Sequence, residues 1–157
     1  MTHRARIGLG ANLGNAEATL EAAFEALSAL GRLLARSALY RSRAWGIRDQ
    51  PDFVNAAALL ETRLPPLELL AGLKSLETQL GRMQTYRWGP RVIDFDILTY
   101  DDLRFDDPAL TLPHPGLFER AFVLAPLAEI DPGYLPAYQS LTPQARSEVE
   151  RLIRPKQ

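Results

Sequence analysis

The sequence predicts an α+β fold with the element order β-α-β-β-α-β, in which helices pack on one face of an antiparallel sheet. Two segments, near 16–30 and 66–83, carry apolar residues at helical spacing. Four short apolar segments are separated by loops rich in Gly, Pro and Asp, which is typical of strands. This order is that of the split β-α-β arrangement. A length of 157 residues favours one domain, so we expect 1–157 to fold together, with 131–157 as a peripheral tail.

The first half of the chain is predicted to hold three strands and one helix. Residues 4–10 form the first strand, and the loop GANLGN leads into a helix over 16–30. Strands then follow over 33–42 and 53–62, joined by a loop over 43–52 that contains Gly, Pro and Asp. The apolar side of the helix consists of Leu20, Phe24, Leu27 and Leu30.

The second half begins with Pro65 and Pro66, which suit the first turn of a helix. That helix is expected to continue to about Met83. The remaining predicted elements are a loop over 84–91, a strand over 92–100, a hairpin near 103–111, and helices near 117–129 and 143–153.

The composition excludes several classes of protein. The formal net charge is −1, which gives no overall field for nucleic acid. The absence of Cys excludes disulfides and thiolate metal sites. No apolar run approaches the ~20 residues of a membrane span, and residues 1–10 do not resemble a signal peptide. We therefore expect a cytoplasmic monomer that binds neither nucleic acid nor membrane.

The strongest local signal is the sequence Ile93-Asp94-Phe95-Asp96-Ile97. Alternate residues of a strand face the same side, so Asp94 and Asp96 share one face while the apolar residues face the core. Two neighbouring carboxylates repel unless one is protonated or a cation lies between them. Hard carboxylate oxygens favour Mg²⁺. A polar face that simply meets solvent is the alternative.

A basic loop precedes this strand. Arg82, Arg87 and Arg91 lie within ten residues that contain no acid, and Arg binds phosphate with paired hydrogen bonds. Trp88 belongs to no helical or strand pattern, so it serves either as a packing anchor or as an aromatic lid. Basic residues followed by acidic ones suit a metal-bound polyphosphate.

Asn55 interrupts an otherwise apolar strand. A buried amide needs partners for its donors and its acceptor, which the backbone or a flat heterocycle can supply. Phe53 lies two residues earlier on the same face, and Trp45 lies in the preceding loop. This combination suits a planar polar ligand.

Two further polar residues leave alternatives open. Glu77 is either a surface carboxylate near Lys74 or a ligand contact at the end of its helix. His114, between two prolines and followed by Arg120 and Phe122, is a poor general base and suits a nucleotide contact better.

Together these motifs resemble the 6-hydroxymethyl-7,8-dihydropterin pyrophosphokinase family of folate biosynthesis. The resemblance covers about residues 5–130, and its most specific part is the pattern RWGPR-x-x-D-x-D. The other matching segments are GANLGN, YRS, DQPDFVNA, Glu77 with Gly81-Arg82, LPH and RAF.

The resemblance implies a ferredoxin-like βαββαβ core with C-terminal additions. It also implies transfer of pyrophosphate from ATP to the hydroxymethyl oxygen of the pterin, giving the pterin diphosphate and AMP. Two Mg²⁺ ions would be held by Asp94 and Asp96. The catalytic residues would be Arg82, Arg91 and Trp88. The pterin would be bound by Ser42, Arg43, Trp45, Phe53, Asn55 and Phe122. ATP would be bound by Glu77, Arg82, Arg91, Ile97, Thr111, His114 and Arg120.

Two other classes remain as alternatives. An RNA-binding module on the same fold would need exposed aromatics on a basic sheet face, whereas this face carries Asp94 and Asp96. A homologue that binds without catalysis is the second, since Gln84 stands where many relatives have a second Arg.

Overall fold

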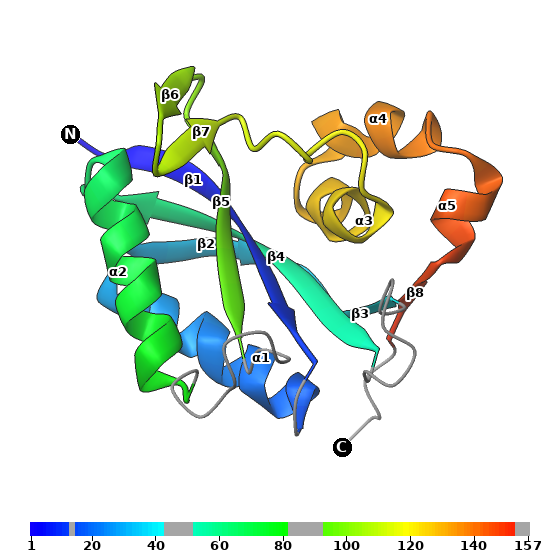
Figure 1. Ribbon diagram of the computed structural model, residues 1–157, viewed down its shortest axis with the longest axis horizontal. Coiled ribbons are helices and arrows are strands. Elements are labelled where there is room, and N and C mark those ends of the chain that lie inside the picture. Colours follow the sequence, from blue (N-terminus) through cyan, green and yellow to red (C-terminus); the bar gives the residue numbers. More distant parts are fainter. Residues whose placement is uncertain (13–14, 43–51, 82–92, 153–157) are drawn as a thin grey trace.

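A six-stranded sheet forms the centre of the protein in the computed structural model, which describes residues 1–12, 15–42, 52–81 and 93–152 (Figure 1). The strand order is β5-β1-β4-β3-β8, and β2 pairs with β4 beside β3. All of these pairings are antiparallel. The strands are β1 (His3–Ala11), β2 (Arg32–Arg36), β3 (Tyr40–Ser42), β4 (Phe53–Thr62), β5 (Asp94–Tyr100) and β8 (Val149–Arg151). The predicted βαββαβ core is confirmed.

Helices cover both faces of this sheet, not only one face as predicted, because α3, which follows the βαββαβ core in the chain, packs on the second face (Figure 1). One face packs against α1 (Ala16–Ala26), with the 3₁₀ turn η1 (Leu27–Ala29), and against α2 (Pro66–Gln79). The other face packs against α3 (Ala121–Ile130). The remaining elements are the hairpin β6 (Phe105–Asp107) and β7 (Leu110–Leu112), the turn η3 (Pro132–Tyr134), α4 (Leu135–Gln139) and α5 (Pro143–Ser147).

The two faces of the sheet differ in polarity and in the size of the apolar cluster that covers them. Ala5, Ile7 and Leu9 point into the main core beneath α1 and α2, where they are almost completely buried. A smaller cluster under α3 contains Ala57 and Leu98. On the same face, the neighbouring positions towards the start of β4 and β5 are polar, and this part of the sheet carries the candidate site.

The predicted strand over 33–42 is two strands. Arg32 lies opposite Glu61, whereas Tyr40 lies opposite Asn55, so the register against β4 moves by two residues between them. At the break, the Ser37 hydroxyl accepts a hydrogen bond from the backbone of Ala57 at 2.9 Å. The Ser37 N–H also donates to the Ala57 carbonyl oxygen at 2.9 Å, so a backbone and a side-chain hydrogen bond together hold the interrupted strand to β4.

The helix predicted near 143–153 forms only over its first five residues. Thr142 caps the short helix α5 by accepting from the N–H of Ala145, and the helix ends at Ser147. The next residues pair with β3, where Val149 lies opposite Ser42. Residues 149–151 therefore form a strand because they pair with the edge of β3, since the conformation of such a short segment depends more on its tertiary contacts than on local preference.

The other helix boundaries differ modestly from expectation. α2 ends at Gln79 rather than near Met83, and Gly81 follows with a φ of 106°, a conformation that suits glycine. α3 begins at Ala121 because Arg120 is extended. Within the described ranges, no helix is long and apolar enough to cross a bilayer.

Candidate active site

Asp94 and Asp96 lie on the face of β5 that points away from the main core. Phe95 and Ile97, which alternate with them, are 2% and 1% exposed. The residues opposite them on β1 are both glycines: Gly10 opposite Asp94, and Gly8 opposite Asp96. The absence of side chains on the adjacent strand leaves room beside the two carboxylates.

Three basic residues from different parts of the chain act on Asp96. Burial raises the pKa of this carboxyl group, and the neighbouring Asp94 raises it further, although Asp96 remains open to solvent. His114, Lys74 and Arg120 lower the same pKa in part. The site therefore combines two close acidic groups with surrounding positive charge.

This donor set fits Mg²⁺ bound together with a polyphosphate. Among the described residues, no group of three or more His, Cys, Asp or Glu forms a cage for a metal ion. Mg²⁺ typically takes one or two carboxylates and completes its shell with phosphate oxygens and water. Burial raises the pKa of Asp96 and repulsion from Asp94 raises it further, and a bound cation would relieve that repulsion.

His114 is fixed close to this pair through its backbone. Its N–H donates to the carbonyl oxygen of Leu98 at 2.9 Å, next to an irregularity in the β1–β5 register. Its Nδ1 accepts from the N–H of Gly116 at 3.0 Å. The neutral ring therefore carries its proton on Nε2, which suits a hydrogen bond to an anionic ligand.

Glu77 lies inside the protein, at 1% exposure. Its Oε2 accepts a hydrogen bond of 2.8 Å from the backbone N–H of Phe95. The Ile97 side chain likewise lies in the core. Of the residues predicted to bind nucleotide, these two are placed beneath β5 rather than on its open face.

A second group of residues surrounds Asn55. This side chain is 5% exposed, and its Nδ2 donates to the Ser42 hydroxyl at 2.7 Å. Gly10 lies opposite Asn55 on β1, where a Cβ atom would come within 3.2 Å of the Asn55 Oδ1. The amide is thus held at a fixed position on the same face as Asp94.

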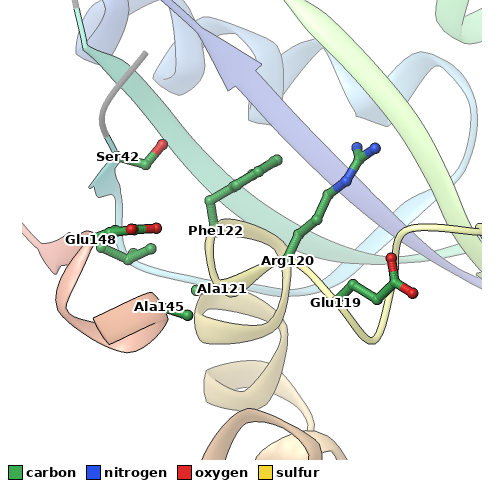
Figure 2. Close-up of a pocket in the computed structure, with 8 residues that line it drawn as sticks. Ser42, Glu119, Arg120, Ala121, Phe122, Ala145 and Glu148 are labelled. Carbon is green, nitrogen blue, oxygen red and sulfur yellow. The ribbon is translucent and has the colours of Figure 1, made fainter. Parts of the chain in front are cut away.

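A cavity of about 290 Å³ opens beside this group, at the beginning of α3 (Figure 2). Phe122 and Arg120 extend towards the sheet, with the guanidinium 5.9 Å from the ring centroid. The lining residues are Ser42, Glu119, Arg120, Ala121, Phe122, Ala145, Glu148 and Val149.

Two further predicted site residues lie within the described part of the chain, and five lie outside it. Phe53 begins β4 opposite Ser42, and Thr111 is exposed on β7. Arg43, Trp45, Arg82, Trp88 and Arg91 lie outside the described residues.

Sequence reasoning missed three residues that shape the site. Lys74 was considered only as a neighbour of Glu77, although its charge reaches Asp96. Gly8 and Gly10 lie within β1, in agreement with the strand predicted over 4–10, but the prediction gives them no part in the site. Their spacing of two within a strand, like that of Asp94 and Asp96, is the signal that could have placed them on one face.

The family model for 7,8-dihydro-6-hydroxymethylpterin-pyrophosphokinase (HPPK) matches residues 6–132. The chain belongs to this family. Relatives from several bacteria, which are named 2-amino-4-hydroxy-6-hydroxymethyldihydropteridine pyrophosphokinase, are similar to this chain over most of its length. The protein of Methylorubrum extorquens is 50% identical over 82% of this chain and 83% of its own length. That of Aquifex aeolicus is 37% identical over 95% and 92%.

Solved structures support the HPPK fold. The HPPK-DHPS of Plasmodium falciparum, crystallised with pterin and p-hydrobenzoate, superposes with a TM-score of 0.73 at 16% identity. The match covers 96% of this chain and 48% of that one. The chain thus spans about half the length of these structures, and at this identity the likeness concerns the ferredoxin-like fold alone.

Proposed function

We propose that this chain transfers the pyrophosphoryl group of ATP to 6-hydroxymethyl-7,8-dihydropterin, giving the pterin diphosphate and AMP for folate biosynthesis. The observation that carries the proposal is the row Asn55–Gly10–Asp94 across β4, β1 and β5. It puts an amide suited to a heterocycle and a carboxylate suited to Mg²⁺ on one face. Family membership supports ATP and the pterin as the substrates.

The reaction requires positioning and charge neutralisation more than covalent catalysis. The hydroxymethyl oxygen attacks the β-phosphorus of ATP, and the bond from that phosphorus to the α,β-bridging oxygen breaks. AMP leaves with the electron pair of that bond, and the alcohol proton passes to Asp96 or to solvent. Two Mg²⁺ ions, held by Asp94 and Asp96, would neutralise the triphosphate and reduce its repulsion of the incoming oxygen.

The chain's own side chains do the rest. Asn55 hydrogen-bonds the pterin edge while Phe53 and Phe122 pack against the ring, with Ser42, Arg43 and Trp45 at the pocket edge. His114, Arg120 and Thr111 contact the nucleotide. Arg82 and Arg91 stabilise the charge that grows on the bridging oxygen, and Trp88 closes the site against water.

We also propose that the chain acts as a single-domain monomer in the cytoplasm, where ATP is available. The formal net charge of −1 supports a protein without nucleic-acid partners. Size-exclusion chromatography with light scattering measures the mass directly, and a dimer mass would contradict this part.

The decisive experiment is AMP release from ATP, with and without 6-hydroxymethyl-7,8-dihydropterin and Mg²⁺. The wild-type chain is expected to release AMP only when both are present. AMP release that ignores the pterin, or none at all, would overturn the proposed activity.

The metal pair is tested by Asp96→Asn, with Asp102→Asn as a control. Asp102 is an exposed aspartate in the turn after β5, and no role in the site is assigned to it. We expect Asp96→Asn to lower kcat on the order of 1000-fold, because about 4 kcal/mol of charge stabilisation disappears. The control should keep the wild-type rate. Near-normal turnover of Asp96→Asn at saturating Mg²⁺ would exclude the two-metal arrangement.

A further inference from the structure

The short strand β8 continues the candidate pterin site beyond β3. Val149 lies opposite Ser42, and Ser42 lies opposite Phe53. Directly paired residues of antiparallel strands project on the same face. The three side chains therefore form one row across β8, β3 and β4, next to Asn55.

The cavity beside Phe122 confirms this placement independently of strand register. Its lining combines Ser42 and Phe122 with Ala145, Glu148 and Val149 (Figure 2). The last three lie beyond residue 132, where the match to the family model ends. Val149 and Glu148 are both partly buried.

Hydrogen bonds to one carboxylate hold β8 and α3 in fixed positions around this cavity. Glu129 of α3 accepts from the Tyr40 hydroxyl at 2.6 Å and from the Ala38 backbone at 2.9 Å. Arg151 of β8 donates to the same carboxylate at 3.3 Å. The distance between Val149 and Phe122, which lie on these two elements, is therefore set by the fold.

We propose that β8 forms the outer wall of the pterin pocket, and that Val149 and Glu148 determine which pterins it accepts. This inference rests on the proposed function. Val149 limits the width of the pocket beside Phe122. The carboxylate of Glu148 favours a heterocycle rich in N–H donors and repels a pterin that carries a carboxylate.

The test of width compares Val149→Phe, Val149→Ala and Glu150→Ala. Glu150 is exposed on the same strand, and it pairs with Arg41 on the opposite face. We expect Val149→Phe to raise the KM for the pterin at least tenfold, while the KM for ATP changes less than twofold. Val149→Ala should raise the KM for the pterin slightly and admit pterins with an added ring methyl group. Glu150→Ala should have the same KM values as wild type.

The test of charge compares wild type with Glu148→Gln. Binding of pterin-6-carboxylate is measured by calorimetry with Mg²⁺ and a non-hydrolysable ATP analogue present. We expect Glu148→Gln to bind this compound about tenfold more tightly than wild type does. Equal binding by the two proteins would overturn the role of Glu148.

Binding of 6-hydroxymethyl-7,8-dihydropterin, measured by calorimetry under the same conditions, separates this inference from the proposed function. If wild type releases AMP but Val149→Phe keeps its pterin KM, the wall proposal alone is overturned. If wild type binds the pterin without turnover and Val149→Phe loses that binding, the wall stands and the activity fails. Failure of wild type to bind any pterin overturns both. An unchanged KM for ATP shows that Val149→Phe is folded.

Discussion

The buried carboxylate of Glu77 is hydrogen-bonded to the backbone N–H of Phe95, the residue between Asp94 and Asp96. β5 is the first strand in the sheet order, so only one of its sides faces another strand of the described sheet. On the other side, α2 supplies Glu77 as an acceptor. This contact fixes the backbone from which both aspartates project.

Glu77→Leu is expected to weaken the apparent affinity of the enzyme for Mg²⁺. The change leaves a buried N–H without its acceptor, at a cost of about 1–3 kcal/mol, and allows the backbone at Phe95 to move. We expect the Mg²⁺ concentration at half-maximal rate to rise several-fold. In Glu77→Gln the amide oxygen can still accept the hydrogen bond from Phe95, so this variant should need a Mg²⁺ concentration close to that of wild type. If Glu77→Leu lowers only the melting temperature, the residue is structural and does not position the aspartates.

Gly10→Ala is expected to weaken pterin binding. The new Cβ would lie 3.2 Å from the Asn55 Oδ1, so the amide must shift away from the position that it now holds. We expect the KM for the pterin to rise several-fold, with the KM for ATP nearly unchanged. Gly8→Ala is the control for the pterin KM alone, because its Cβ would lie beside Asp96 and not Asn55, and would meet only the Leu98 side chain, no closer than 3.4 Å. Equal pterin KM values for Gly10→Ala and wild type would contradict the spacing argument.

Lys74→Gln is expected to raise the KM for ATP several-fold while the pterin KM stays the same. Lys74 is exposed on α2 and acts electrostatically on Asp96, so its charge also reaches a triphosphate bound there. Arg104→Gln, which removes an exposed positive charge elsewhere, serves as the control. The effect should shrink at high salt, which screens charges that are exposed to solvent. A salt-independent loss would point to a lost packing contact instead.

Acid is expected to destabilise the junction of α3, β3 and β8 through Glu129. Burial alone would raise the pKa of this carboxyl group. Hydrogen bonds from Tyr40, Ala38 and Arg151 outweigh that effect and lower the pKa from its ordinary 4.5. A depressed folded-state pKa gives stability that is complete above the unfolded value and is lost as pH falls through the folded value.

The measurement is denaturant unfolding of wild type and Glu129→Gln between pH 7 and pH 3. At pH 7 the variant should be less stable by about 1–2 kcal/mol, because hydrogen bonds to a charged acceptor become neutral. The difference should narrow as pH falls below 4.5. A constant difference across this range would exclude the charge of Glu129 as its cause.

The sequence was sufficient where local pattern decides structure. Alternation along Ile93–Ile97 placed Asp94 and Asp96 away from the core, and the apolar run before Pro65 gave the bounds of β4 correctly. Distant contacts explain the differences. The break between β2 and β3 depends on Glu129, which binds Ala38 across 91 positions of sequence. β8 forms only because β3 presents an edge to it.

The role of Glu77 shows a second limit. Its position at the edge of a helical stripe was compatible with both solvent and a ligand, and only the tertiary structure shows that it meets the backbone of β5. Whether each remaining site residue touches ligand stays a prediction from family resemblance, to be tested by the variants above.

Ile7 and Leu9 alternate with Gly8 and Gly10 along β1, so mutations at the first two positions affect the core and mutations at the other two affect the candidate site. Saturation mutagenesis scored once for abundance and once for growth without added folate should divide this strand by parity. Substitutions at Ile7 and Leu9 would fail both screens, whereas many substitutions at Gly8 and Gly10 would yield an abundant protein that no longer supports growth.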